Sequence, residues 1–149
     1  MSDEFKTMGK IIIIPVDLSG IRIADMPYLN DKEVLAYFDK QIGCDLVEDV
    51  MPVMWYKKFG RKYPDNYPSK VPVMLVDEEG LLKDKKMNLA ASYFYGMEEH
   101  GNPIVGDVII AGLFMTKDGL SCCGLTDEVC NAIFEDAINM SNLHSKGRK

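Results

Sequence analysis

The chain has 149 residues, of which 47% are hydrophobic and 27% charged, the composition and length of one globular domain. No run of about 18 apolar residues occurs, so no membrane-spanning helix is expected, and the polar N-terminus lacks the apolar middle of a secretory signal. A net charge of −6 argues against a general DNA or membrane-surface binder. We therefore expect one cytoplasmic domain over residues 1–149.

The charge is unevenly distributed along the chain. Residues 57–70 carry a net charge of +4, and residues 144–149 add +3, which leaves −13 on the remainder. The four cysteines do not have the dense, regular spacing of a secreted disulfide framework. We interpret them as thiols in a reducing compartment; they are Cys44, Cys122, Cys123 and Cys130.

The first elements form a predicted hairpin followed by a helix. Residues 11–16 are a β-branched apolar run typical of a buried strand, and residues 21–25 alternate in polarity after a turn. Asn30 followed by Glu33 has the spacing of a capping box, so a helix is expected to begin there. Gly43 suits the left-handed residue that ends such a helix.

The middle of the chain is predicted to contain two strands and a long loop. Residues 50–56 are rich in β-formers, and Pro52 favours an edge strand or a bulge. Residues 57–70 then form a surface loop, which is long for a compact domain. Residues 71–76 return to strand character, and after a turn Leu81–Leu82 are expected to pair back as a short arm.

The second half is predicted to contain two helices and a second hairpin. Residues 87–95 form a short helix that Gly96 ends, and residues 105–114 form a central strand. A turn at 117–119 leads back into residues 120–123. Thr126 caps the last helix, and residues 141–149 are expected to be a flexible tail. Clustered strands joined by hairpins predict an α+β fold, with a mainly antiparallel sheet and two or three helices packed on one face.

Three stretches resemble a known family in their order and spacing. They are Val76–Leu82 with Met87–Ala91, then Tyr95–Gly96 leading to Ile104–Gly112, and finally Gly124–Glu128. The sequence resembles domain-of-unknown-function family 3846, whose members are small proteins of phages, plasmids and Firmicutes. Residues 57–70 depart from the family pattern and look like an insertion. The resemblance implies a mobile-element setting and a compact fold, and it implies no reaction.

The sequence contains none of the common catalytic or phosphate-binding motifs. Its two histidines, His100 and His144, give little support to a histidine general base, so we expect no catalytic residues and no cofactor. The adjacent pair Cys122 and Cys123 does not have the spacing of a zinc site, and these thiols are interpreted as small buried hydrophobes. The acidic turn Asp77–Glu79 either holds a divalent cation or is a solvated turn.

Two sets of residues are candidate binding sites. Asn88 either caps its short helix or faces a ligand pocket with Tyr95 and Asp107. In the basic loop, aromatic and cationic side chains alternate, which suits a protein partner or the stacking and phosphate contacts of nucleic acid. The alternative is that its tyrosines pack back on the domain. The loop residues are Tyr56, Lys57, Lys58, Phe59, Arg61, Lys62, Tyr63 and Tyr67.

The leading hypothesis is a non-enzymatic binding protein of phage or mobile-element origin. It would occupy a host macromolecule, with a host protein as the expected partner and nucleic acid or a nucleotide as the alternative, as a counter-defence or host-takeover factor. A second hypothesis is a protein that sequesters a small ligand or nucleotide. A homodimer interface is one place where its pocket could lie. A third is a metal-dependent enzyme acting on nucleic acid or nucleotides through the Asp77–Glu79 carboxylates.

Overall fold

The computed structural model describes residues 7–44, 47–80, 83–96 and 103–147. Within these ranges a six-stranded sheet runs in the order β2-β1-β5-β4-β3, and β6 pairs with β5. Every ladder between strands is antiparallel. The strands are β1 (Thr7–Ile14), β2 (Arg22–Pro27), β3 (Val47–Val50), β4 (Pro72–Asp77), β5 (Val108–Thr116) and β6 (Gly119–Cys123).

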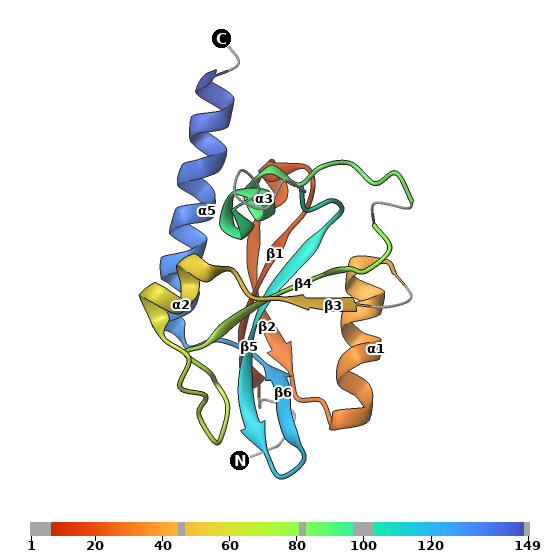
Figure 1. The fold of residues 1–149 in the computed structure, drawn as a ribbon, viewed down its shortest axis with the longest axis vertical. Helices are drawn as coiled ribbons and strands as arrows, with labels where there is room; N and C mark the ends of the chain where they lie inside the picture. Colours follow the sequence, from red (N-terminus) through yellow and green to blue (C-terminus); the bar gives the residue numbers. More distant parts are fainter. Residues whose placement is uncertain (1–6, 45–46, 81–82, 97–102, 148–149) are drawn as a thin grey trace.

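Helices cover both faces of this sheet (Figure 1). The α+β class is confirmed, but the prediction that all helices pack on one face is wrong. The four described α-helices also exceed the expected two or three; they are α1 (Asp31–Ile42), α2 (Val53–Phe59), α3 (Leu89–Tyr95) and α5 (Asp127–Gly147). A short 3-10 turn, η2 (Leu18–Gly20), joins β1 to β2. None of the described helices is both long and apolar enough to cross a membrane.

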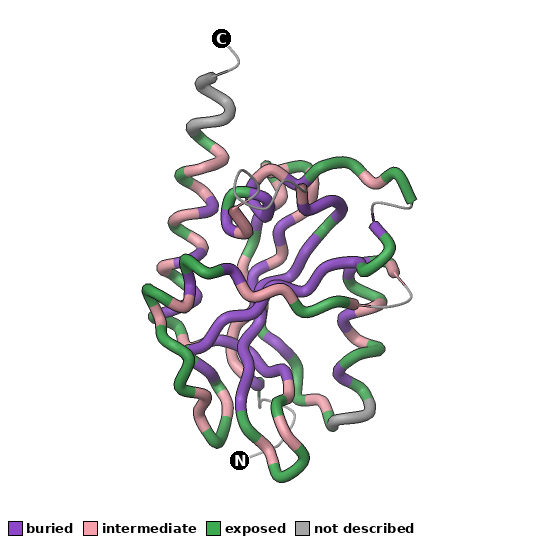
Figure 2. The backbone as a smooth tube through the Cα atoms, viewed as in Figure 1, coloured by how far each residue is buried: buried purple, intermediate pink, exposed green. Residues whose placement is uncertain are grey.

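Two hydrophobic cores explain why both faces need cover. All six residues of β4 are buried, so its side chains require apolar partners above and below the sheet (Figure 2). The first core joins the sheet to α2, α3 and α5, through side chains such as Ile110, Trp55, Phe94 and Ile133. The second core joins the opposite face to α1, where Phe38 is completely buried. Alternation along the strands therefore assigns each side chain to one core or the other.

Several local predictions are confirmed by hydrogen bonds. The predicted hairpin is the β1–β2 pair, with Ile12 opposite Ile23. The capping box at the start of α1 is reciprocal: the Glu33 amide donates to Asn30 Oδ1 at 3.0 Å, and the Asn30 amide donates to Glu33 Oε1 at 3.1 Å. At the start of α5, the Val129 amide donates to Thr126 Oγ1 at 3.4 Å. The Leu81–Leu82 arm lies outside the described residues.

Two segments differ from the prediction. The expected strand at 50–56 is mostly helix, because β3 ends at Val50 and α2 begins at Val53, directly after Pro52. Proline is well tolerated at a helix start, where its missing N–H has no intrahelical role. In addition, α5 continues past Ser141 to Gly147, so the segment expected to be a tail is helical through that residue. The C-terminal turns of α5 project beyond the rest of the molecule (Figure 1).

Three glycines allow β1, β5 and the segment after β6 to cross closely. We call Gly9, Gly112 and Gly124 the glycine crossing. The Gly124 amide donates to the Met8 carbonyl at 2.7 Å. A Cβ at Gly124 would lie only 2.6 Å from the Lys10 amide nitrogen, and one at Gly112 only 2.8 Å from the Gly124 carbonyl oxygen. Side chains at these positions are therefore incompatible with the observed backbone path.

Candidate functional site

The predicted basic loop is divided between a helix and a loop. Tyr56, Lys57, Lys58 and Phe59 lie on α2, and the loop proper begins at Gly60. The helix presents its aromatic and basic side chains in different directions, because successive residues of a helix are rotated by about 100°. The segment therefore does not form one continuous strip of alternating aromatic and basic side chains.

Most of its aromatic side chains pack back on the domain. Phe59 packs against the first core, and Tyr63 and Tyr67 pack against the second. The Tyr67 ring lies edge-on to the ring of Phe114, with the two ring centroids 5.8 Å apart. The centroid of the Tyr28 ring lies 6.4 Å from that of Tyr67. These rings consequently make intramolecular contacts. This agrees with the alternative interpretation of the sequence, in which the tyrosines pack back on the domain.

The basic side chains remain at the surface. The Arg61 guanidinium stacks on the Tyr56 ring, 3.8 Å from its centroid. Lys58 forms an ion pair with Asp136 of α5, at 3.7 Å between Nζ and Oδ2. Lys57 and Lys62 are exposed. Cationic groups thus gather at the C-terminal end of α2, where the helix dipole also favours them.

A groove between α2 and α3 has one of these cations, Lys57, in its lining. Its volume is about 260 Å³, and its lining includes Val53, Met54 and Lys57 of α2 and Tyr93 of α3. Three of these side chains are apolar yet remain 48%, 39% and 50% exposed, at Val53, Met54 and Tyr93 respectively. We call this set the α2 surface; it consists of Val53, Met54, Tyr56, Lys57, Arg61 and Tyr93.

The predicted ligand residues do not form one pocket. Asn88 is fully buried, and all of its side-chain groups are engaged within the protein. Its Oδ1 accepts from the Ala91 amide at 3.0 Å, which caps α3, and its Nδ2 donates to the carbonyls of Ile14 and Gly106, both at 2.9 Å. Asp107 instead accepts a hydrogen bond from the Val16 amide at 2.9 Å. Asn88 and Asp107 therefore have structural roles.

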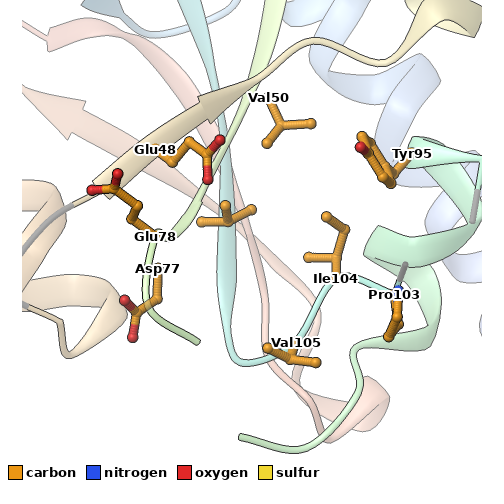
Figure 3. A pocket seen from close by; sticks show the side chains of 9 residues that line it. Glu48, Val50, Asp77, Glu78, Tyr95, Pro103, Ile104 and Val105 are labelled. Carbon is orange, nitrogen blue, oxygen red and sulfur yellow. The ribbon is translucent and has the colours of Figure 1, made fainter. Parts of the chain in front are cut away.

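Tyr95 is the member of that set that lines a cavity. Figure 3 shows it on one side of the cavity, with Glu48 of β3 and Glu78 on the other side. The volume is about 150 Å³, and apolar side chains such as Val50 and Ile104 complete the wall. We call this space the first cavity, because its apolar lining belongs to the first core.

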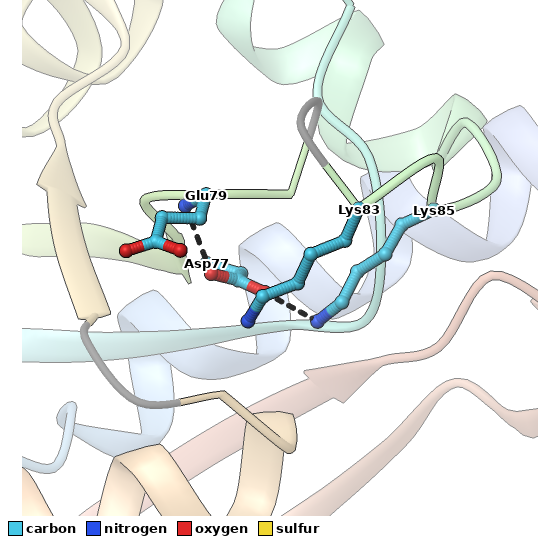
Figure 4. A network of polar contacts seen from close by, with 4 residues as sticks. All are labelled: Asp77, Glu79, Lys83 and Lys85. Carbon is cyan, nitrogen blue, oxygen red and sulfur yellow. Dashed lines mark hydrogen bonds and ion pairs between the residues drawn. The ribbon is translucent and has the colours of Figure 1, made fainter.

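In the acidic turn, the Asp77 carboxylate faces the basic side chains of Lys83 and Lys85 (Figure 4). Asp77 is buried and forms ion pairs with Lys85 at 2.6 Å and Lys83 at 3.1 Å, and it accepts from the Glu79 amide at 2.9 Å. Burial raises the pKa of Asp77, but the hydrogen bonds from Lys85, Glu79 and Lys83 outweigh it, and the pKa is lowered overall. Among the described residues, no three metal-ligating side chains of His, Cys, Asp or Glu come together. The described residues of this turn therefore do not provide the metal site that the hypothesis of a metal-dependent enzyme requires.

The thiols of the second half are buried, as expected. Burial raises the pKa of Cys122 and Cys123 to about 12 and that of Cys130 to about 11. Thiolates are the reactive form of cysteine, so burial disfavours the reactive form of these three side chains, which pack as small hydrophobes.

A larger cavity lies on the opposite face, between α1, the end of β3 and the β5–β6 hairpin. Its volume is about 460 Å³. Apolar side chains including Leu35, Met51 and Leu120 line it, together with the carboxylates of Asp49 and Asp118. We call it the second cavity. No pattern in the sequence predicted either cavity, since each is lined by elements that are distant along the chain.

No model of a known protein family matches the sequence, and no curated protein matches it either. The resemblance to family 3846 therefore stays a prediction. A solved structure with a similar fold is described as the crystal structure of small RNA methyltransferase HEN1, with a TM-score of 0.55 and 16% sequence identity. The match covers 84% of this chain and 16% of that chain, so it concerns the fold of a small part of that protein.

Proposed function

We propose that this chain is a non-enzymatic binding protein that binds a host protein through the α2 surface. The observation that carries the proposal is a groove with exposed apolar walls and Lys57 in its lining, on the same helix whose C-terminal end carries the stacked Arg61–Tyr56 pair. The resemblance to a family of phages and plasmids supports a role in counter-defence or host takeover. On this proposal the rest of the molecule is the scaffold that holds α2 and α3 in place.

The chemistry of the α2 surface favours a protein partner with acidic and apolar groups. Arginine and tyrosine are enriched among the residues that dominate protein interfaces, and methionine adapts to irregular partners. Lys57 provides positive charge in the lining of the groove, and Arg61 adds a second cation just after α2, while Val53 and Tyr93 provide apolar area that water would otherwise cover. An acidic rim around an apolar projection on the partner would match this arrangement.

Nucleic acid is the alternative partner, and two observations weigh against it. A single strand is usually held by aromatic rings on which successive bases stack. Here Tyr63 and Tyr67 pack against the second core instead. The overall charge of −6 also repels phosphate. The solved structure with a similar fold is a small RNA methyltransferase, so RNA is an outcome that the experiment must distinguish.

The test is affinity capture from a bacterial lysate with the tagged full chain, followed by cross-linking mass spectrometry. A double charge reversal, Lys57→Glu with Arg61→Glu, should reduce recovery of the partner by about tenfold or more, since losing two interface cations costs about 1.4 kcal/mol or more. Both residues are exposed, so the fold should be unaffected. Cross-links between the two proteins should join the partner to residues of α2 in this chain.

Lys117→Glu, an exposed charge reversal in the β5–β6 turn, is the matched control and should leave recovery unchanged. Nuclease treatment separates the partner classes. Capture that disappears after nuclease treatment would replace the protein partner with nucleic acid. Equal recovery by the double variant and the parent chain would refute the α2 surface as the binding site.

A further inference from the structure

Strand β3 lies at one end of the sheet. Among the described residues it forms a ladder with β4 alone, from Val47 opposite Asp77 to Val50 opposite Met74. The backbone groups on the other side of β3 point away from β4 and form no ladder in the described part of the chain. Such an edge can pair with a further extended strand from another molecule.

Side chains of β3, and of Met51 directly after it, reach two different cavities in alternation. Glu48 and Val50 line the first cavity, and Asp49 and Met51 line the second, on the opposite face of the sheet. A strand that paired with β3 would also direct its side chains alternately to the two faces. One set of its side chains would enter the first cavity, and the other set would enter the second.

The two cavities differ in what they accept. In the first, the carboxylates of Glu48 and Glu78 lie beside apolar walls (Figure 3), which suits a long cationic side chain whose methylenes cover the walls while its charge meets the carboxylates. The second is about three times larger, at about 460 Å³ against 150 Å³; Asp49 and Asp118 contribute carboxylates to it, but most of its wall is apolar, from residues such as Leu113 and Leu120. It therefore suits a large apolar side chain.

We propose that β3 binds an extended segment of a protein partner in which basic and large apolar residues alternate. The partner's backbone adds a strand to the sheet, its basic side chains enter the first cavity, and its apolar side chains enter the second. Main-chain hydrogen bonds supply affinity, and the two cavities supply specificity. This edge is distinct from the α2 surface, so the two proposals can fail separately.

The charges on β3 argue against a second copy of the chain as the occupant. If two copies paired through β3, Glu48 and Asp49 would lie opposite or next to their own counterparts. Like charges placed across a strand pair are destabilising. Burial also raises the pKa of the Asp49 carboxyl, so a further negative charge nearby would be especially unfavourable. A basic segment removes this repulsion.

The experiment measures binding of a short fluorescent peptide of alternating lysine and leucine to the full chain. A Glu48→Gln, Glu78→Gln double variant should bind it about tenfold more weakly, and a matched Asp65→Asn, Glu128→Gln variant should bind it as the parent does. In two comparison peptides, every second backbone amide is N-methylated, starting from the first residue in one and from the second in the other. Alternate amides of a strand point to opposite sides, so one of these peptides has lost the N–H groups that would pair with β3. Hydrogen exchange should show new protection at residues 47–50 only with the pairing-competent peptides.

Several results would overturn the proposal. Equal affinity of both N-methylated peptides would reduce the interaction to charge attraction, and equal binding by both double variants would place the peptide elsewhere. Protection of residues 47–50 that grows with protein concentration, without peptide, would assign the edge to a second copy. An absence of binding would leave Glu48 and Asp49 the simpler role of protecting the edge against unwanted pairing.

Discussion

Asn88 connects three parts of the fold through one side chain. It caps α3 and also binds the carbonyls of Ile14, at the end of β1, and Gly106, before β5. From the sequence, Asn88 was interpreted either as a helix cap or as a pocket residue. The cap was predicted because asparagine before a short apolar helix is a common start signal. The carbonyl contacts could not be predicted, since they join residues 74 and 18 positions away in the chain.

Replacing Asn88 with alanine should destabilise the protein by about 3 kcal/mol, because the variant loses a cap and leaves two buried carbonyls without a donor. Urea unfolding followed by circular dichroism measures this change. Asn131→Ala, at an exposed position of α5, is the control and should change stability by less than about 0.5 kcal/mol. A loss as small as the control's would show that water replaces the missing amide.

At the scale of elements, α2 shows where composition misleads. Residues 50–56 contain valine, tryptophan and tyrosine, which favour a strand. The spacing of Trp55 and Phe59, four residues apart, together with Pro52 before them and Gly60 after them, was the available helix signal. Helix α1 was predicted correctly because its capping box and its apolar spacing agree. Agreement between independent local signals is what makes an element predictable.

The same limit applies to the candidate sites. The basic segment was visible in the sequence as a charge cluster, but the apolar half of the α2 surface was not, because Tyr93 belongs to a different helix. The two cavities beside β3 also depend on which strands become neighbours. Sequence patterns identify the face of an element, and only the packing of elements brings two faces together.

The glycine crossing gives a prediction for the strands it joins. Gly124→Ala should abolish folding or destabilise the protein by more than about 3 kcal/mol, because its methyl group would overlap the backbone of Gly9 and Lys10. Gly43→Ala is the control: it has a positive φ of +77° but open space around it, so it should cost only about 1–2 kcal/mol. Thermal unfolding compares the two. Similar losses would mean that β1 shifts to accept the methyl group.

For the whole molecule, Asp77 links stability to acid. Its pKa is lowered in the folded protein, from an ordinary value of 3.8, so its ion pairs stabilise the fold above about pH 4. That stabilisation disappears as the pH falls through the lowered pKa. An Asp77→Asn variant should therefore be less stable than the parent at pH 7, and the difference should shrink in acid. Urea unfolding across this pH range measures the difference.

Asp49 provides a control of opposite sign. Its pKa is raised by burial, so its charge opposes folding at neutral pH, and Asp49→Asn should be no less stable than the parent at pH 7. Any gain should vanish as the pH falls below the raised pKa. If the Asp77→Asn difference were the same at every pH, it would come from how the asparagine amide fits this site, and the charge of Asp77 would contribute nothing.

The glycine crossing also bears on how the chain is made. During synthesis, β1 and β2 emerge before β5 and can form their hairpin, but β5, the other neighbour of β1, begins about a hundred residues later at Val108. Until then, β1 has no strand on its other side. The closing contact, between Gly9 and Gly124, waits longer still. Vectorial synthesis therefore leaves the β1–β2 hairpin without this neighbour until β5 has been made, and we expect the hairpin to be the segment that a chaperone protects.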